Sequence, residues 1–166
     1  DGLERVTVVR VVDGDTVRVR RAGREEPVRL IGVDSPEAHD SDKLDRDARR
    51  SRRSRTSIVA LGRAAAAYTT RRLLGQTVGL ALDTESHDRY GRLLAYVWLD
   101  DGTLFNAALL RDGYAQPLTI APNVRYAPLF RALADEARRA DRGLWARGMT
   151  PRRQSRSPRA MRISRS

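Results

Sequence analysis

The sequence predicts an α+β fold in which five strands close a small β-barrel and three helices pack around it. Two observations lead to this class. Five segments have the residue types and spacing of β-strands, and the helical segments lie after the third strand and near the C-terminus. The chain has 166 residues, the length of one domain that can bury a substantial core.

The first third of the chain predicts a meander of three strands. Residues 6–12 are nearly continuous in β-branched side chains, and residues 17–20 alternate valine and arginine with a period of two. The Asp-Gly pair at 13–14 between them is typical of a hairpin turn. A second turn, the Ala-Gly pair at 22–23, leads to a third strand over residues 28–33.

Residues 38–57 carry charge where the flanking segments carry apolar side chains. The charge is first mixed and then wholly basic over residues 49–55, and Leu44 stands alone as a large apolar side chain. Because so little can be buried, we expect a long exposed loop inserted into the domain. The basic run leaves a second interpretation open, a nucleic-acid-binding arm.

The middle of the chain predicts one long helix and two further strands. Residues 58–74 place leucine, alanine and tyrosine on one helical face, and Gly75 is positioned to end that helix. Residues 77–82 and 93–99 have the composition of strands, and the second is apolar enough to be buried on both sides.

The C-terminal third predicts two helices. A short helix over residues 105–111 precedes a glycine, and a longer one over residues 126–140 repeats apolar side chains at helical spacing. Leu144 and Trp145 are expected to fold back as an anchor. Together the elements fit a five-stranded Greek-key barrel of the OB type with three helices.

The chain is strongly basic, with 32 lysines and arginines against 21 acids and a formal net charge of +11. Such a charge favours polyanionic partners, nucleic acid first and an acidic membrane surface second. Residues 151–166 hold six arginines and no acid. We therefore expect a domain over residues 1–148 and a disordered basic tail over residues 149–166.

Features that the sequence lacks restrict the kinds of site and the location that we expect. The absence of cysteine excludes disulfides, thiolate metal sites and cysteine nucleophiles. No apolar run approaches the ~20 residues that span a bilayer, so we expect no membrane segment. The N-terminus shows no signal-peptide pattern, although a start at Asp1 leaves room for a cleaved leader.

Asp15, Asp34 and Glu37 supply three carboxylates that could hold a hard metal ion. Acids without histidine or cysteine suit calcium or magnesium rather than zinc. Calcium tolerates irregular geometry and backbone ligands, so two aspartates plus the main-chain oxygen of Ser35 suit it better; magnesium stays open. Each piece also has an ordinary explanation, a hairpin turn or a capped helix N-terminus.

Arg29 and Arg92 stand where a solvated charge is awkward. Arg29 shares its strand parity with Ile31 and Val33, and Arg92 follows a glycine at the head of an apolar strand. A charge turned toward an apolar face costs free energy unless a partner or ligand receives it. A buried structural ion pair and a pair of phosphate-binding guanidinium groups are both compatible with this pattern.

Four motifs that occur in order give the chain a resemblance to a known family. They are Val-Asp-Gly-Asp-Thr-Val at 12–17, Arg-Leu-Ile-Gly-Val-Asp-Ser-Pro-Glu at 29–37, Asp-Arg-Tyr-Gly-Arg-Leu-Leu-Ala-Tyr at 88–96, and Phe-Asn-Ala-Ala-Leu-Leu-Arg-Asp-Gly-Tyr-Ala at 105–115. With the Gly-Leu-Trp at 143–145, the chain resembles the staphylococcal nuclease, or thermonuclease, family over about residues 5–147.

The resemblance implies a calcium-dependent nuclease that hydrolyses phosphodiester bonds. The implied substrates are single- and double-stranded DNA and RNA, cleaved to 3′-phosphate products. Asp15 and Asp34 match the residues that ligate Ca²⁺ by carboxylate, and Ser35 matches a ligand that uses its carbonyl. Asp13 matches an acid near the metal. By analogy, we expect a monomer in a secreted or extracytoplasmic location.

The resemblance also implies roles around the phosphate. Glu37 matches the general base that activates the attacking water, and Arg29 and Arg92 match the catalytic pair that binds the phosphate. Arg89 and Tyr90 match residues that contact a nucleotide's terminal phosphate.

Two departures from the family pattern and one competing hypothesis remain. Serine replaces the family's threonine at position 35, and the family's two tyrosines beside the nucleotide have no clear equivalent in residues 116–122. Stacking contributes ~1 to 3 kcal/mol per base, so base preference is open. The competing hypothesis is a noncatalytic nuclease-like OB module that binds nucleic acid or protein. Such modules usually lose the acids or arginines that this chain retains.

Overall fold

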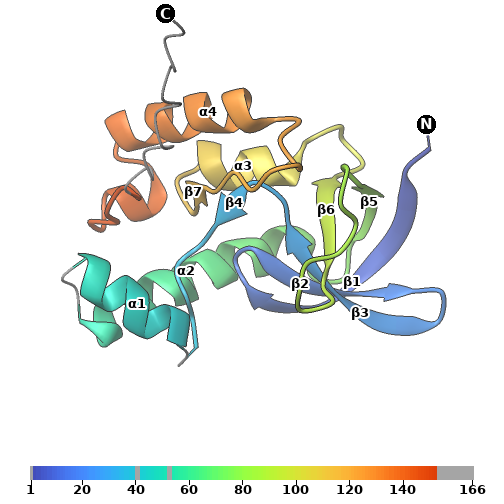
Figure 1. The fold of residues 1–166 in the computed structure, drawn as a ribbon, viewed down its shortest axis with the longest axis horizontal. Helices are drawn as coiled ribbons and strands as arrows, with labels where there is room; N and C mark the ends of the chain where they lie inside the picture. The colour runs from blue at the N-terminus through green and yellow to red at the C-terminus, as the bar shows by residue number, and fades with distance from the viewer. Residues whose placement is uncertain (1, 40–41, 52–53, 153–166) are drawn as a thin grey trace, which may run out of the picture.

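The computed structural model describes residues 2–39, 42–51 and 54–152, and it confirms the α+β fold (Figure 1). Five strands close a barrel in the order β1-β2-β3-β6-β5. Neighbouring strands are antiparallel except β3 and β6, which run parallel. The barrel strands are β1 (Glu4–Asp13), β2 (Thr16–Arg21), β3 (Arg24–Leu30), β5 (Thr77–Ala81) and β6 (Leu93–Trp98).

Valines that alternate along the strands fill the inside of the barrel. Val8 lies opposite Val19, Val17 lies opposite Val28, and all four have 0% of their surface exposed. The turn at 22–23 has φ of 49° and 76° at its two residues, as a two-residue hairpin loop of type I′ needs. These local patterns explain why the three-strand meander was predictable from sequence.

The third strand ends earlier than predicted, at Leu30 rather than at Val33. Gly32 turns the chain with φ of +79°, and the ring of Phe130 packs so closely that a Cβ at this glycine would lie 2.6 Å from it. The next residues form β4 (Val33–Asp34), which pairs with β7 (Gln116–Pro117) in a separate two-stranded sheet. The chain therefore leaves the barrel just before Asp34.

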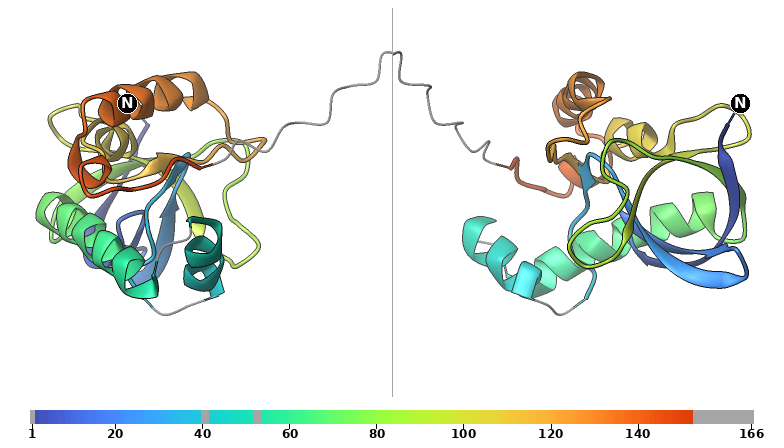
Figure 2. Two further views of the ribbon diagram at one scale, coloured as in Figure 1. Left: turned by 90° about the vertical axis from the view of Figure 1, so that its left-hand side faces the viewer. Right: turned by 45° about the vertical axis from the view of Figure 1, so that its right-hand side comes forward.

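Three helices lie close to their predicted positions. They are α2 (Arg55–Leu73), α3 (Phe105–Arg111) and α4 (Ala127–Arg139). Helix α2 lies along the barrel against β1, while α3 and α4 pack on each other at another side (Figure 2). The predicted anchor is the buried 3₁₀ turn η1 (Gly143–Trp145). None of the helices in the described ranges is long and apolar enough to cross a membrane.

The predicted loop over residues 38–57 is wrong for its central part. Residues Asp42–Ser51 form an additional helix, α1, which packs against α2. Leu44 is 1% exposed, and Arg55 at the start of α2 forms an ion pair with Asp45. One buried leucine and a charge pair are enough to dock a short helix of residues with adequate helix propensity, and a search for hydrophobic periodicity does not detect them.

Buried packing reaches Met149, next to residue 148, the predicted end of the domain. Met149 is buried with Leu144 and Trp145 in a small second core, and its backbone nitrogen donates a hydrogen bond to the Leu144 carbonyl at 3.0 Å. The described chain then runs on to Arg152. Of the predicted tail, residues 153–166 lie outside the described residues.

A buried asparagine joins α3 to the point where the chain leaves the barrel. Asn106 is fully buried; its Nδ2 donates to the Ile31 carbonyl and its Oδ1 accepts from the Val97 backbone nitrogen, both at 2.9 Å. Since a buried polar group costs free energy unless it is hydrogen-bonded, these bonds specify where residue 31 lies relative to β6.

We expect Gly62→Ala to destabilise the protein, although alanine is the better helix former. Gly62 lies on α2 directly under the backbone of Glu37, which a Cβ would overlap. Displacing that backbone should lower the free energy of unfolding by about 1 to 3 kcal/mol. Urea unfolding of the variant and the wild type measures this difference. On an open helix the same change stabilises by roughly 0.5 to 1 kcal/mol, so a gain in stability would contradict this packing.

Candidate active site

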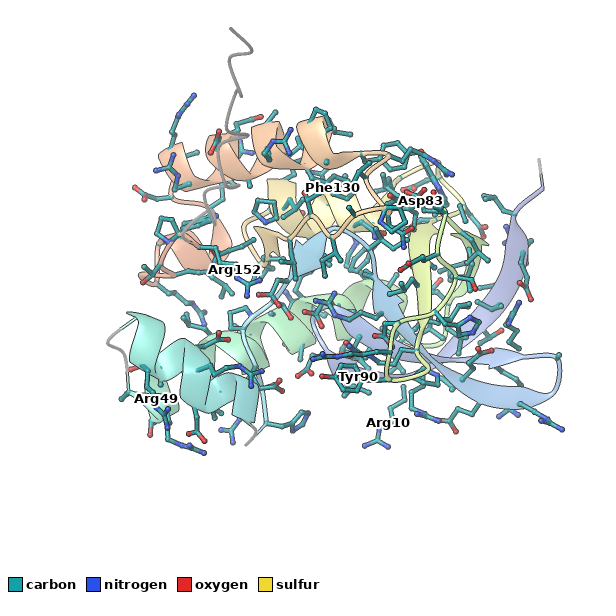
Figure 3. The ribbon with its side chains drawn as sticks, in the orientation of Figure 1. Arg10, Arg49, Asp83, Tyr90, Phe130 and Arg152 are labelled. Carbon is teal, nitrogen blue, oxygen red and sulfur yellow. The ribbon has the colours of Figure 1, made fainter. Side chains whose placement is uncertain are left out.

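A cleft of about 550 Å³ opens where β3, β4, α1 and the connection between β5 and β6 meet. Figure 3 shows Tyr90 on that connection and Arg152 beside β7, and both line the cleft. Ser35 is buried and does not line it. The other residues predicted for the site all do: Asp13, Asp15, Arg29, Asp34, Glu37, Arg89, Tyr90 and Arg92.

Asp15 links the first hairpin to the segment that follows β4. Its Oδ2 accepts a hydrogen bond from the backbone nitrogen of Ser35 at 2.9 Å, and its Oδ1 accepts from the Thr16 hydroxyl at 2.8 Å. Gly14 permits this approach, because a Cβ there would lie 2.9 Å from the side chain of Ser35. The Asp-Gly-Asp sequence therefore forms the hairpin turn and also attaches the segment that follows β4 to that turn.

Arg29 lies between two carboxylates. Its Nη1 donates to the carbonyls of Leu30 and Val33, each at 2.8 Å, which holds the guanidinium plane in place. Its Nη2 lies 3.3 Å from Asp15 Oδ2 and 3.5 Å from Asp34 Oδ1. The side chain is 14% exposed. The sequence is compatible with either an ion pair or a ligand-binding group at this position. In the structure Arg29 combines the two, because it has acidic partners and also faces the cleft.

Glu37 and Asp13 approach each other where the chain passes α2. A carboxylate oxygen of Glu37 accepts from the His39 backbone nitrogen, and one of Asp13 accepts from the Ala38 backbone nitrogen, both at 3.3 Å. Burial, then the negative charges of Glu37 and Asp15, raises the pKa of Asp13 to about 6. The acidic half of the cleft is therefore crowded with like charge.

Arg92 is held by Asp88 within a tight turn. Asp88 Oδ1 accepts from the backbone nitrogens of Tyr90 and Arg92 at 2.9 and 3.0 Å, and its Oδ2 accepts from Arg92 Nε at 2.8 Å. Burial by itself would raise the pKa of Asp88, but the hydrogen bonds from Arg92 outweigh it and lower the pKa. Asp88 is the first residue of the motif at 88–96, but the sequence alone did not identify it as the partner of Arg92.

Tyr90 provides an exposed aromatic face at the edge of the cleft. The residue is 68% exposed. Arg89 donates to its hydroxyl at 2.7 Å, and the guanidinium carbons of Arg89 and Arg92 lie 4.8 and 5.4 Å from its ring centre. Two guanidinium groups thus flank one ring, an arrangement suited to phosphate and base together.

The three predicted carboxylates do not come together as one metal-binding group. Among the described residues, no three histidine, cysteine, aspartate or glutamate side chains are arranged to hold an ion. Glu37 bonds to the His39 backbone instead of joining Asp15 and Asp34. Those two aspartates, however, both lie within 3.5 Å of one positively charged nitrogen of Arg29. They can therefore share a cation, and their hard oxygen donors fit calcium or magnesium.

Several further residues of the cleft were not found from sequence. Arg46 and Asp47 come from α1, whose helical structure was missed, and Arg152 comes from the segment assigned to the tail. Asn123 also lines the cleft; its side chain exchanges hydrogen bonds with the backbone of Glu85 at 2.8 and 2.9 Å. No local pattern marks these positions, because only the fold brings them to the cleft.

A five-stranded barrel with this helix order places the chain in the OB class, and a cleft that combines acids with arginines is suited to a phosphodiester substrate. Comparison with known sequences gives the particular family. The model for staphylococcal nuclease homologues matches residues 27–147, and the chain belongs to that family.

Individual relatives cover most of the chain. A thermonuclease of Staphylococcus intermedius is 38% identical over 144 residues, covering 87% of this chain and 77% of the relative. A thermonuclease of Staphylococcus hyicus is 34% identical over 139 residues, with 84% and 74% covered. An uncharacterized endonuclease of Escherichia coli O157:H7 is 32% identical over 139 residues, with 84% and 75% covered.

We expect Asp13→Asn to stabilise the protein near neutral pH in metal-free buffer. A carboxyl whose pKa is raised in the folded state, here from 3.8 to about 6, stabilises the fold while protonated. That contribution is lost as the pH rises across this interval. The Tm of the wild type should therefore fall relative to that of the variant between about pH 4 and pH 6. Parallel Tm profiles for the two proteins would contradict the raised pKa.

Proposed function

We propose that this protein is a calcium-dependent nuclease that hydrolyses phosphodiester bonds of DNA and RNA, without sugar specificity, to 3′-phosphate products. Membership of the staphylococcal nuclease family and the thermonuclease and endonuclease relatives support a nuclease. The calcium requirement and the products are carried over from the family resemblance, and the hard oxygen donors of the site are compatible with calcium. We further propose a monomer that acts outside the cytoplasm, by analogy with the family.

One observation carries the proposal: Arg29 from β3 and Arg92 from the head of β6 line one cleft together with Glu37. Hydrolysis of a phosphodiester increases the negative charge on the phosphoryl oxygens in the transition state. Two guanidinium groups that are already oriented stabilise that state more than the ground state. Arg29 is oriented by the Leu30 and Val33 carbonyls, and Arg92 is oriented by Asp88.

Asp15 and Asp34, with the carbonyl of Ser35, would hold the divalent cation. When bound, the cation supplies positive charge near the phosphate and makes a neighbouring water easier to deprotonate. The Leu30 and Val33 carbonyls would keep Arg29 in place for the phosphate while Asp15 and Asp34 hold the cation.

Glu37 would take the proton of the attacking water. It lies on the acidic side of the cleft, beside Asp13, while the phosphate would be held by Arg29 and Arg92. The water attacks phosphorus, the bond to the 5′ oxygen breaks, and that oxygen takes up a proton from solvent. The products are a 3′-phosphate and a 5′-hydroxyl. Arg89 and Tyr90 at the rim would contact the next phosphate and base.

We expect cleavage of single-stranded DNA in calcium and none in chelator. Arg29→Lys and Glu37→Gln should lower kcat by about 10² to 10³, because each removes a group that acts in the transition state. Lysine keeps the charge at 29 but loses the two-pronged geometry. Arg10→Ala is the matched control, since Arg10 is an exposed barrel arginine that does not line the cleft.

The assay also tests the choice of metal and the competing hypothesis. Parallel reactions in magnesium separate the two hard cations. DNA binding without cleavage in either metal, by a folded wild-type protein, would favour the noncatalytic module. Equal cleavage by the wild type and by both site variants would refute the assigned roles.

Asp88→Asn should lower kcat more than it raises KM. Asparagine can keep the backbone hydrogen bonds of the turn but loses the charge-assisted bond to Arg92 Nε. A guanidinium misplaced by about 1 Å can cost up to about 10²-fold in rate. Asp100→Asn is a suitable control, because Asp100 is an exposed aspartate paired with Arg5 outside the cleft. A kcat unchanged from that of the wild type would contradict a positioning role for Asp88.

A further inference from the structure

Arg152 enters the cleft from the C-terminal segment and contacts Asp34. Met149 is buried three residues earlier, and the backbone nitrogen of Arg152 donates to the side-chain oxygen of Gln116 on β7. Gln116 lies directly opposite Asp34 in the small sheet. The segment is therefore held on the strand next to the predicted metal ligand, and the position of Arg152 is built into the fold.

The guanidinium of Arg152 still has hydrogen-bonding capacity. Its Nη1 lies 3.2 Å from Asp34 Oδ2, yet within the described part of the chain no acceptor is in hydrogen-bond geometry with this buried nitrogen. The side chain is 30% exposed. Asp34 is 11% exposed. Because the buried Nη1 lacks a well-formed hydrogen bond, this pair is incompletely satisfied, and the guanidinium can leave Asp34 for an acceptor that meets it in better geometry.

Among the described residues, Arg152 is one of only five arginines that line a cleft of net negative formal charge. Seven carboxylates line the cleft against five arginines, so without Arg152 the formal charge falls from −2 to −3. A polyanion needs every available positive charge to enter such a cleft. The acids are Asp13, Asp15, Asp34, Glu37, Asp47, Glu85 and Asp88, and the arginines are Arg29, Arg46, Arg89, Arg92 and Arg152.

We propose that Arg152 is a substrate-binding residue that contacts a phosphate flanking the scissile one and rests on Asp34 while the cleft is empty. This inference rests on the proposed nuclease function. A cation bound by Asp34 neutralises the partner of Arg152 and repels its guanidinium. The incoming nucleic acid then offers a phosphate that the guanidinium can contact. Arg29 and Arg92 hold the reacting phosphate, and Arg152 extends the grip along the strand.

Substrates of different length test the proposal. Arg152→Ala should raise KM for a single-stranded 12-mer about tenfold while kcat stays within about twofold, because a phosphate contact outside the reacting group supports binding. For a dinucleotide, which has only the reacting phosphate, KM should stay unchanged. Arg152→Lys should recover part of the loss. Arg147→Ala is the control, an exposed arginine of the same segment outside the cleft.

The salt dependence of kcat/KM for the 12-mer gives a second measurement. Loss of one phosphate contact should reduce the slope of log(kcat/KM) against log[salt] by about 0.7. An unchanged KM for the 12-mer, or an equal rise for the dinucleotide, would overturn the proposal.

Calcium binding without substrate gives a readout that does not depend on turnover. By titration calorimetry, Arg152→Ala should bind Ca²⁺ more tightly than the wild type and than Arg147→Ala, because Asp34 no longer shares its charge with Arg152. Equal affinities would overturn the exchange at Asp34. If the wild type cleaves nothing in any metal, the proposed function fails. Anisotropy of a labelled 12-mer in calcium then still tests Arg152, through the same difference in salt slope.

Discussion

Two oppositely charged side chains of the barrel hold β4 and the residue that follows it, and the site depends on this attachment. Asp15 accepts a hydrogen bond from the backbone of Ser35, while Arg29 donates to the carbonyl of Val33. The two charges lie 3.3 Å apart, at 4% and 14% exposure. Burial of such a pair is costly unless further hydrogen bonds satisfy both groups, and here the segment that carries Asp34 supplies them.

The same attachment gives the cleft its two chemical halves. The basic half, Arg29 and Arg92, comes from the barrel. The acidic half combines Asp13 and Asp15 at the first hairpin with Asp34 and Glu37 from the chain that has left the barrel. Crowding of like charge raises the pKa of Asp13, while the turn around Asp88 keeps Arg92 in place. The crowded carboxylates are unfavourable to one another, and a bound cation would relieve that repulsion. Under the proposed function, the two oriented arginines would then receive the phosphate.

The differences between expectation and structure have a common cause. Hydrophobic alternation and turn residues are local signals, so the barrel, the meander and the helix Phe105–Arg111 followed from the sequence. Helix α1 depends on one buried leucine, and the early end of β3 depends on the ring of Phe130 against Gly32. Each is a contact between separate elements, which the pattern within one element does not contain.

The sequence by itself determined the fold class, the family resemblance and eight of the residues that meet in the cleft, because the motifs carry their chemistry within short, stiff stretches of chain. Only the tertiary structure decided how these residues are partnered: Arg29 between two aspartates, Asp88 on Arg92, and Arg152 on Asp34. Pairing of charges requires a distance of a few ångströms in space, and folding of the whole chain sets that distance.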